Sequence, residues 1–215
     1  MTSTVSDNPL ETGNPSLNGL VLAGGKSTRM GRDKGSLQWH GKEQRFYLAD
    51  LLQQFCKEVF ISCRPEQEKS FTGKGYQVIT DAYEGLGPYG AILSAFQHNE
   101  KTAWLVIACD LPLLDHNTIL QLTSERDQSY IATTFKSPHD GLPEPLVTIW
   151  EPACYPILLA SLSKGYQCPR KALINNHVKI IYPENPLALS NVNTPGEFAL
   201  VQQLLSNASG ELENY

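Results

Sequence analysis

Near the beginning of the chain, a short apolar run passes directly into two glycines and a basic loop. Leu20–Ala23 has the composition of a buried strand, Gly24 and Gly25 follow it, and the loop carries Arg29 and ends at Lys34. Glycine permits positive φ angles and leaves no Cβ in the way of a ligand. The main-chain N–H groups of such a turn can form an anion-binding nest. The stretch therefore predicts a site for the phosphates of a nucleoside triphosphate.

Two familiar phosphate-binding motifs do not fit this stretch. A P-loop that ended at Gly25-Lys26-Ser27 would need a glycine at position 20, which is Leu20. The dinucleotide motif G-x-G-x-x-G also fails, because Gly24, Gly25 and Gly31 have the wrong spacing. An ordinary strand-to-helix turn is the structural alternative, but a plain turn needs neither a loop of this length nor its positive charge.

Composition and charge limit the class of protein. The chain has 215 residues, of which 41% are hydrophobic and 18% charged, so it can form one α/β domain with a full core. Its net charge of −5 argues against a general nucleic-acid surface, which needs a basic face. No apolar stretch approaches the roughly 20 residues that span a bilayer, and no secretory signal pattern is present. We expect a cytoplasmic protein without nucleic-acid or membrane partners.

The cysteines and histidines show no metal or disulfide pattern. The cysteine count is odd and no C-x-x-C pair occurs, which predicts buried, reduced thiols. The histidines form no H-E-x-x-H motif, so a zinc hydrolase has no support. The five cysteines are Cys56, Cys63, Cys109, Cys154 and Cys168.

The sequence predicts one folded domain between two polar tails. Residues 1–16 contain few large apolar side chains, and residues 207–215 are similar, so we expect both tails to be mobile. Apolar runs between them alternate with segments of helical spacing, which predicts a doubly wound, mostly parallel α/β sheet for residues 17–206. The predicted strands are Gly19–Ala23, Val59–Cys63, Tyr76–Thr80, Trp104–Ala108, Ile131–Thr134, Leu146–Trp150 and Val178–Tyr182.

Two aspartates follow predicted strands at the edge where such sheets bind ligands. Asp110 comes after Trp104–Ala108, and a carboxylate there is costly unless it is paired or bound to a metal. Mg²⁺ favours one or two carboxylates together with triphosphate oxygens, although Asp110 could instead cap the following turn. Asp81 comes after Tyr76–Thr80 and could accept from a guanine edge or a ribose hydroxyl, or cap its own turn.

The stretch Leu22–Lys34 resembles the signature L-A-G-G-x-S-x-R-M-G-x-D-K of the molybdenum cofactor guanylyltransferases. This family is a branch of the nucleotidyltransferases, which have a Rossmann-like sheet. The resemblance continues in the right order from about Leu17 to Leu205. The further matching segments are Asp81, Gly87-Pro88-Tyr89-Gly90, Cys109-Asp110-Leu111-Pro112 and Asn191-Val192-Asn193-Thr194-Pro195.

The resemblance implies a reaction and a set of site residues. A member of this family transfers GMP from GTP to molybdenum-bound molybdopterin and releases pyrophosphate, with Mg²⁺ as the cofactor. Asp110 would hold the metal, while Lys34 and Arg29 would stabilise the charge that develops on the phosphates. Transient contact with molybdoenzyme apoproteins or maturation factors is also implied. The nucleotide-binding residues would be Leu22, Ala23, Gly24, Gly25, Lys34, Asp81 and Asp110.

The resemblance also implies two residues that would bind the acceptor, molybdenum-bound molybdopterin. By resemblance, Asn193 lies near the metal and the acceptor phosphate, and Arg170 belongs to a basic element near the acceptor. The segment Gly141–Leu146 would line the pterin side of the cleft, or form a simple turn before the next strand. Structural roles remain open: Thr194 and Glu197 have the spacing of a capping box, and Arg170 could lie on a capped surface helix.

Two departures from the family pattern leave the base open. Tyr89 stands where relatives usually have leucine, and Ile61–Cys63 contains no asparagine where some relatives contact the nucleotide. The alternatives are CMP transfer to the same cofactor, nucleotidyl transfer to a sugar phosphate, or a non-catalytic nucleotide-binding or cofactor-delivery module. The combination of Asp110 and Lys34 favours an enzyme, since a scaffold needs neither.

Overall fold

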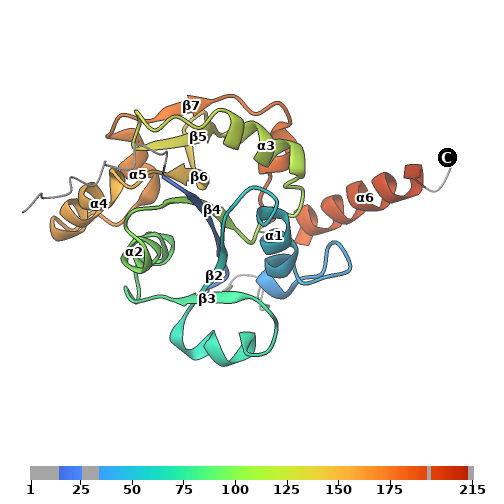
Figure 1. The fold of residues 1–215 in the computed structure, drawn as a ribbon. Coiled ribbons are helices and arrows are strands. Elements are labelled where there is room, and N and C mark those ends of the chain that lie inside the picture. The colour runs from blue at the N-terminus through green and yellow to red at the C-terminus, as the bar shows by residue number, and fades with distance from the viewer. Residues whose placement is uncertain (1–14, 26–33, 193–194, 213–215) are drawn as a thin grey trace, which may run out of the picture.

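The computed structural model describes residues 15–25, 34–192 and 195–212. Within these residues the chain forms a seven-stranded sheet with helices on both faces (Figure 1). The strand order is β3-β2-β1-β4-β6-β5-β7. The strands are β1 (Leu17–Leu22), β2 (Val59–Cys63), β3 (Gln77–Thr80), β4 (Ala103–Ala108), β5 (Ala132–Lys136), β6 (Pro143–Trp150) and β7 (Lys179–Ile181).

Six of these strands run in one direction, and β6 is antiparallel to both of its neighbours, β4 and β5. The expectation of a doubly wound, mostly parallel sheet is therefore confirmed. Each of the seven apolar runs in the sequence coincides with a strand. Such runs are typical of strands that are covered on both faces.

The helices divide between the two faces of the sheet. Helices α1 and α3 lie on one side and α2, α4 and α5 on the other, while α6 extends away from the body (Figure 1). The α-helices are α1 (Gln44–Leu52), α2 (Pro88–His98), α3 (His116–Ser124), α4 (Cys154–Ser163), α5 (Pro169–Ile174) and α6 (Pro195–Leu212). Short 3₁₀ helices are η1 (Lys34–Ser36), η2 (Pro65–Phe71) and η3 (Pro186–Leu189).

The two helical layers enclose two hydrophobic clusters. Phe46 on α1 and Ile119 on α3 pack against one face of the sheet. Phe96 on α2, together with Trp104 and Trp150, fills the other face, and all three side chains are fully buried. Successive residues of the central strand β4 alternate between the clusters, because neighbouring side chains on a strand point to opposite faces. The core thus holds the strand ends, and the residues directly after them, in a rigid arrangement.

Strand β6 begins earlier than the sequence analysis expects. The turn reading of Gly141–Leu146 is wrong from residue 143 onward, because β6 starts at Pro143. Prolines normally argue against a central strand. Here β4 pairs only with residues from Val147 onward, so the proline-containing start of β6 passes beyond the end of β4. Because β6 is antiparallel, this start lies at the carboxyl edge of the sheet.

Several smaller expectations can be compared with the structure. All five cysteines lie in the described residues and are free thiols. Cys63, Cys109 and Cys154 are buried, but Cys56 is only partly buried and Cys168 is exposed. Helix α6 continues to Leu212 and so passes the domain limit expected at residue 206, and the domain limits stay a prediction. In the part of the chain that the structure describes, no helix combines the length and apolarity needed to cross a membrane.

Candidate active site

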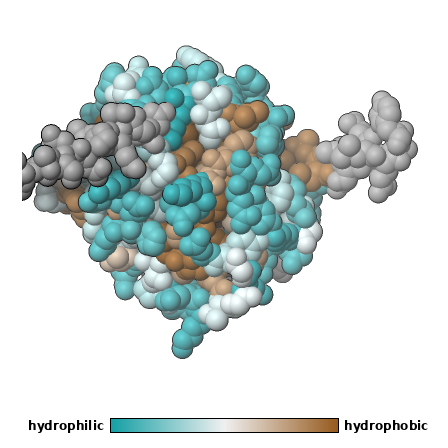
Figure 2. Space-filling view, viewed as in Figure 1, coloured by the Kyte–Doolittle hydropathy of each residue, from teal (hydrophilic) through white to brown (hydrophobic). Residues whose placement is uncertain are grey.

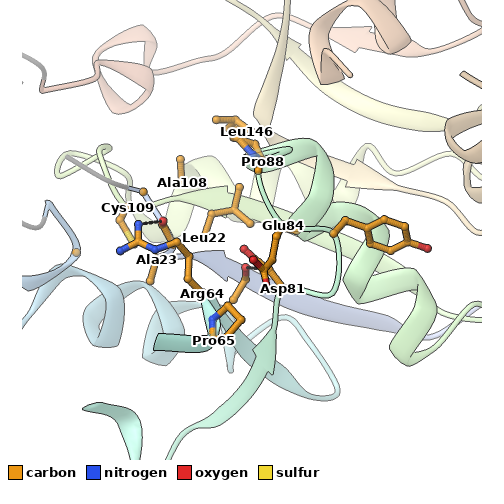
Figure 3. A pocket seen from close by; sticks show the side chains of 18 of the residues that line it. Leu22, Ala23, Arg64, Pro65, Asp81, Glu84, Pro88, Ala108, Cys109 and Leu146 are labelled. Carbon is orange, nitrogen blue, oxygen red and sulfur yellow. Dashed lines mark hydrogen bonds between the residues drawn. The ribbon is translucent and has the colours of Figure 1, made fainter. Parts of the chain in front are cut away.

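A cavity of about 610 Å³ opens at the carboxyl ends of the four strands β1–β4. Arg64 and Asp81 reach into it from β2 and β3, and Leu146 and Pro88 lie on its opposite side (Figure 3). The space-filling view shows apolar residues gathered at the centre of one face, with hydrophilic residues around them (Figure 2). Of the nucleotide-binding residues expected from the sequence, the cavity is lined by Leu22, Ala23, Gly24, Gly25, Asp81 and Asp110.

The glycine turn after β1 uses one of the two properties of glycine named in the sequence analysis, the absence of a Cβ. Neither Gly24 nor Gly25 has a positive φ angle, so the left-handed backbone that glycine permits is not adopted at either position. Gly24 is instead required by close approach: a Cβ there would lie 3.2 Å from Oδ2 of Asp81 and 3.6 Å from Cγ of Arg64. A missing side chain at residue 24 therefore keeps this part of the cavity floor open.

Asp81 is held at the end of β3 by its neighbours. Its main-chain N–H donates to the oxygen of Cys63 at 2.9 Å, and its Oδ1 accepts from the Ser62 hydroxyl at 2.6 Å. Burial raises the pKa of Asp81, while the Ser62 hydrogen bond and the positive charge of Arg64 oppose that rise. The carboxylate is thus placed and oriented as a hydrogen-bond acceptor in the cavity wall.

Arg64 is a cavity residue that the sequence analysis missed. It follows β2 directly, and its Nη1 donates to the main-chain oxygen of Gly24 at 2.7 Å. Its Nε donates to Glu66 Oε1 at 2.6 Å. The signal available in the sequence was its position, because Arg64 ends a predicted strand in the same way as Asp81 and Asp110. Ser62 was noted only for lacking an amide, although it is the residue that orients Asp81.

Asp110 lies just beyond β4 and is half-buried at the cavity wall. The main-chain N–H of Val192 donates to the main-chain oxygen of Asp110 at 2.9 Å. This contact brings the segment that precedes Asn193 to the end of β4, although Asn193 itself lies outside the described residues. A carboxylate at this strand end, in a cavity of triphosphate size, fits Mg²⁺, which would take its remaining ligands from phosphate oxygens and water.

Arg170 lies in a small cluster with two carboxylates. Its Nη1 is 2.6 Å from Asp140 Oδ2, and its Nη2 is 3.4 Å from Glu144 Oε2. Glu144 is 9% exposed. Burial raises the pKa of Glu144; Arg170 opposes the rise, while Asp110 and Asp140 add to it. Neither Arg170 nor Glu144 lines the cavity, and the connection to it is the charge of Asp110, which acts on Glu144 at the start of β6.

Two expected site residues, Arg29 and Lys34, come from the basic loop. Arg29 lies outside the described residues. The backbone of Lys34 begins η1, and the next residue, Gly35, lines the cavity, so the chain at Lys34 returns to the site.

Tyr89, the departure from the family pattern, does not line the cavity. It is buried under α4, where its hydroxyl donates to the main-chain oxygen of Leu158 at 2.9 Å. The departure at Tyr89 is therefore a packing feature.

Comparisons with known proteins agree with this fold. A model of the MobA-like NTP transferase domain matches residues 19–180. The chain is 33% identical over 86% of its length to the molybdenum cofactor biosynthesis bifunctional protein of Synechocystis sp., of which it spans 53%, about half. It is 30% identical over 82% of its length to the molybdenum cofactor guanylyltransferase of Pseudomonas entomophila, of which it covers 93%.

A solved structure shows the same fold. The molybdopterin-guanine dinucleotide biosynthesis protein A from Archaeoglobus fulgidus superposes with a TM-score of 0.74 at 22% identity, over 88% of this chain and 99% of that one. Together with the match over residues 19–180, the strand-end cavity and its glycine turn lead to one conclusion. The chain belongs to the family of MobA-like NTP transferases.

Proposed function

We propose that this protein transfers GMP from GTP to the phosphate of molybdenum-bound molybdopterin and releases pyrophosphate. The observation that carries the proposal is that Asp110, Asp81 and the Gly24–Gly25 turn line one cavity at the carboxyl ends of β4, β3 and β1. The relative in Pseudomonas entomophila, named a molybdenum cofactor guanylyltransferase, supports the choice of GTP and this acceptor.

The chemistry needs positioning and charge stabilisation. An oxygen of the acceptor phosphate attacks the α-phosphorus of GTP and forms a new P–O bond. The bond from the α-phosphorus to the oxygen that bridges to the β-phosphate breaks, and pyrophosphate leaves with the electron pair. The acceptor is already an ionised phosphate, so no side-chain nucleophile is required. Catalysis then depends on alignment and on groups aimed at the developing charge.

We assign a part of this reaction to each residue from its position in the site. Asp81 on β3 binds the nucleoside, and the turn at Gly24 and Gly25 lets the phosphates approach the backbone. Asp110 would hold Mg²⁺, which when bound neutralises charge on the triphosphate. Lys34 and Arg29 add fixed positive charge. On the far side of Asp110, Arg170 binds the acceptor phosphate, and Asn193 follows Val192, which is hydrogen-bonded to Asp110.

Pyrophosphate release tests the proposal directly. The purified protein is assayed with Mg²⁺ and either GTP or CTP, with and without molybdenum-bound molybdopterin. We expect release with GTP only when the acceptor is present. Preference for CTP would contradict guanylyl transfer, and nucleotide binding without turnover in the presence of acceptor would indicate a binding module.

A pair of variants separates catalysis from folding in the same assay. Asp110→Ala should lower turnover by at least about a hundredfold, as expected when a group that stabilises transition-state charge is lost. Its circular dichroism and thermal melt should stay close to wild type. Glu100→Ala removes an exposed carboxylate outside the cavity and should retain full activity. Retained activity in Asp110→Ala would remove the metal-ligand assignment.

A further inference from the structure

Two side chains of opposite character converge above Gly24. The position that a Cβ of residue 24 would occupy lies 3.2 Å from Asp81 Oδ2 and 3.6 Å from Arg64 Cγ. Asp81 follows β3 and Arg64 follows β2, and both line the cavity (Figure 3). A hydrogen-bond acceptor and a hydrogen-bond donor therefore flank a stretch of backbone that carries no side chain.

The guanidinium of Arg64 is anchored and still has donors to offer. Nη1 donates to Gly24 O at 2.7 Å, and Nε donates to Glu66 Oε1 at 2.6 Å. Nη2 makes no hydrogen bond with any residue that the structure describes. The side chain is 26% exposed, so it is not a freely solvated surface arginine. Anchoring reduces the entropy that a long side chain would lose when it binds a ligand.

Asp81 is the matching acceptor. Its Oδ1 accepts from Ser62 Oγ at 2.6 Å, which fixes the carboxylate plane, and its Oδ2 is the atom directed toward Gly24. Burial raises the pKa of Asp81, and Ser62 and Arg64 oppose that rise by favouring the ionised form, which can only accept. Asp81, an acceptor, and Arg64, a donor, thus flank Gly24, which has no side chain.

This pair of groups can bind the Watson–Crick edge of guanine. Guanine carries the acceptor O6 beside the donors N1–H and N2–H₂, with the acceptor N7 on the other side of O6. Arginine donating to O6 and N7 is a strong way to recognise guanine. Adenine places an amino donor at position 6, where it would face the Arg64 donors and leave both unpaired.

We propose that Arg64 is a specificity-determining residue of this protein: its free guanidinium edge donates to O6 of the GTP base, while Asp81 accepts from the N1–H and N2–H₂ side. Residues 61–64 contain no amide side chain, and the Ser62 hydroxyl donates to Asp81, so Arg64 is the residue of this segment that offers a donor to the base. This inference rests on the proposed function, because it takes GTP as the nucleotide.

The test uses nucleotides that differ in the groups on their base edge. Dissociation constants are measured calorimetrically, with Mg²⁺, for GTP, ITP, ATP and 2-aminopurine riboside triphosphate. ITP keeps O6 and N1–H but lacks the 2-amino group, whereas the 2-aminopurine nucleotide keeps the 2-amino group but lacks O6 and N1–H. The proteins are wild type, Arg64→Met, Arg64→Lys and the control Lys69→Met. The control removes a positive charge from the exposed face of η2, at a residue that does not line the cavity.

Arg64→Met should weaken the binding of GTP and of ITP about ten- to hundredfold, the range typical of an arginine–guanine contact. It should change the affinity for the 2-aminopurine nucleotide less than about threefold, because that base has no O6 for Arg64 to contact. Arg64→Lys should retain part of the preference, and Lys69→Met should bind all four nucleotides as wild type does. Thermal melts confirm that each variant is folded.

Three outcomes would overturn the role of Arg64. Equal weakening of all four nucleotides would mean that its charge acts on the phosphates, and no weakening at all would mean that it is structural. If the wild-type protein bound the 2-aminopurine nucleotide as tightly as GTP, that result would also contradict the proposed contact of Arg64 with O6. The proposed function is tested separately by pyrophosphate release: if turnover with GTP persists in any of these cases, only the Arg64 assignment fails.

Discussion

The side-chain Nε2 of Gln44 donates a hydrogen bond to the main-chain oxygen of Leu111 at 3.1 Å, across 67 residues of sequence. Gln44 is fully buried at the start of α1, and Leu111 directly follows Asp110. Nearby, His40 Nε2 lies 2.9 Å from the oxygen of Pro112. A carbonyl only accepts, so the His40 Nε2 carries the hydrogen. Two donors from one short segment therefore hold the turn that follows Asp110.

Gln44→Leu should impair use of the metal. The substitution leaves the Leu111 oxygen without its donor and lets the Asp110 turn move, and small displacements of a catalytic group cost large factors in rate. We expect turnover to fall roughly tenfold and the Mg²⁺ concentration for half-maximal activity to rise. A Mg²⁺ titration of pyrophosphate release measures both quantities. Gln53→Leu, at an exposed glutamine just after α1, serves as the control. An unchanged Mg²⁺ dependence in Gln44→Leu would show that the turn holds its position unaided.

Asp81→Asn should stabilise the protein at neutral pH while it weakens nucleotide binding. Burial raises the pKa of Asp81 above its ordinary value. The folded state therefore binds the proton more tightly than the unfolded state, and that stabilisation is present below the ordinary pKa and lost as pH rises through the folded-state pKa. We expect the variant to melt above wild type at pH 7, with the difference shrinking toward pH 4.

Asp127 offers a control of opposite sign for this experiment. Hydrogen bonds from the Ser129 hydroxyl and main-chain N–H lower the pKa of Asp127, so its charge favours the folded state above its ordinary pKa. Asp127→Asn should therefore melt at or below wild type at pH 7. An Asp81→Asn variant that melts below wild type at pH 7 would contradict the assigned effect of burial.

Gly90→Ala should destabilise the fold near the cavity. A Cβ on Gly90 would lie 2.4 Å from the main-chain oxygen of Tyr83, so backbone must move to accommodate it. We expect a loss of roughly 1–3 kcal/mol in the free energy of unfolding, typical of an overpacked site. Chemical denaturation measures the loss. Gly196→Ala is the matched control, since no described atom lies within 4 Å of its Cβ position. Equal stability of the two variants would contradict the close approach of Gly90 to the Tyr83 backbone.

Arg170→Gln should weaken binding of the acceptor and leave binding of GTP unchanged. Its ion pair with Asp140 is partly exposed, with side-chain exposures of 32% and 42%, so the contact is weak and a phosphate can replace it. A charge-assisted contact from arginine to phosphate is a strong one. We expect KM for the acceptor to rise about tenfold with KM for GTP unchanged, which steady-state kinetics with each substrate varied will measure.

Lys171→Gln is the control for that variant, because Lys171 is the exposed neighbour of Arg170 on α5. It should leave both KM values close to those of wild type. A rise in KM for GTP in Arg170→Gln, or the same change in both variants, would place Arg170 outside the acceptor site.

The strands and their end residues could be predicted from the sequence for a local reason. A buried strand leaves a continuous apolar run, and a polar residue that follows it falls at the sheet edge whatever the rest of the chain does. Asp81 and Asp110 were found in this way, and both line the cavity. Gly24 was also found, because it leaves no Cβ in the cavity, although it does not adopt the positive φ angle that glycine permits.

The sequence by itself determined that this chain is an α/β protein with a phosphate-binding turn and two carboxylates at strand ends, because those features depend on a few consecutive residues. Only the tertiary structure decided that β6 runs antiparallel and brings Leu146 to the cavity. It also decided that Arg64 reaches the Gly24 oxygen across 40 residues of sequence. Strand order, strand direction and the contact of two distant side chains arise from packing of the whole sheet, and no local pattern of residue types records them.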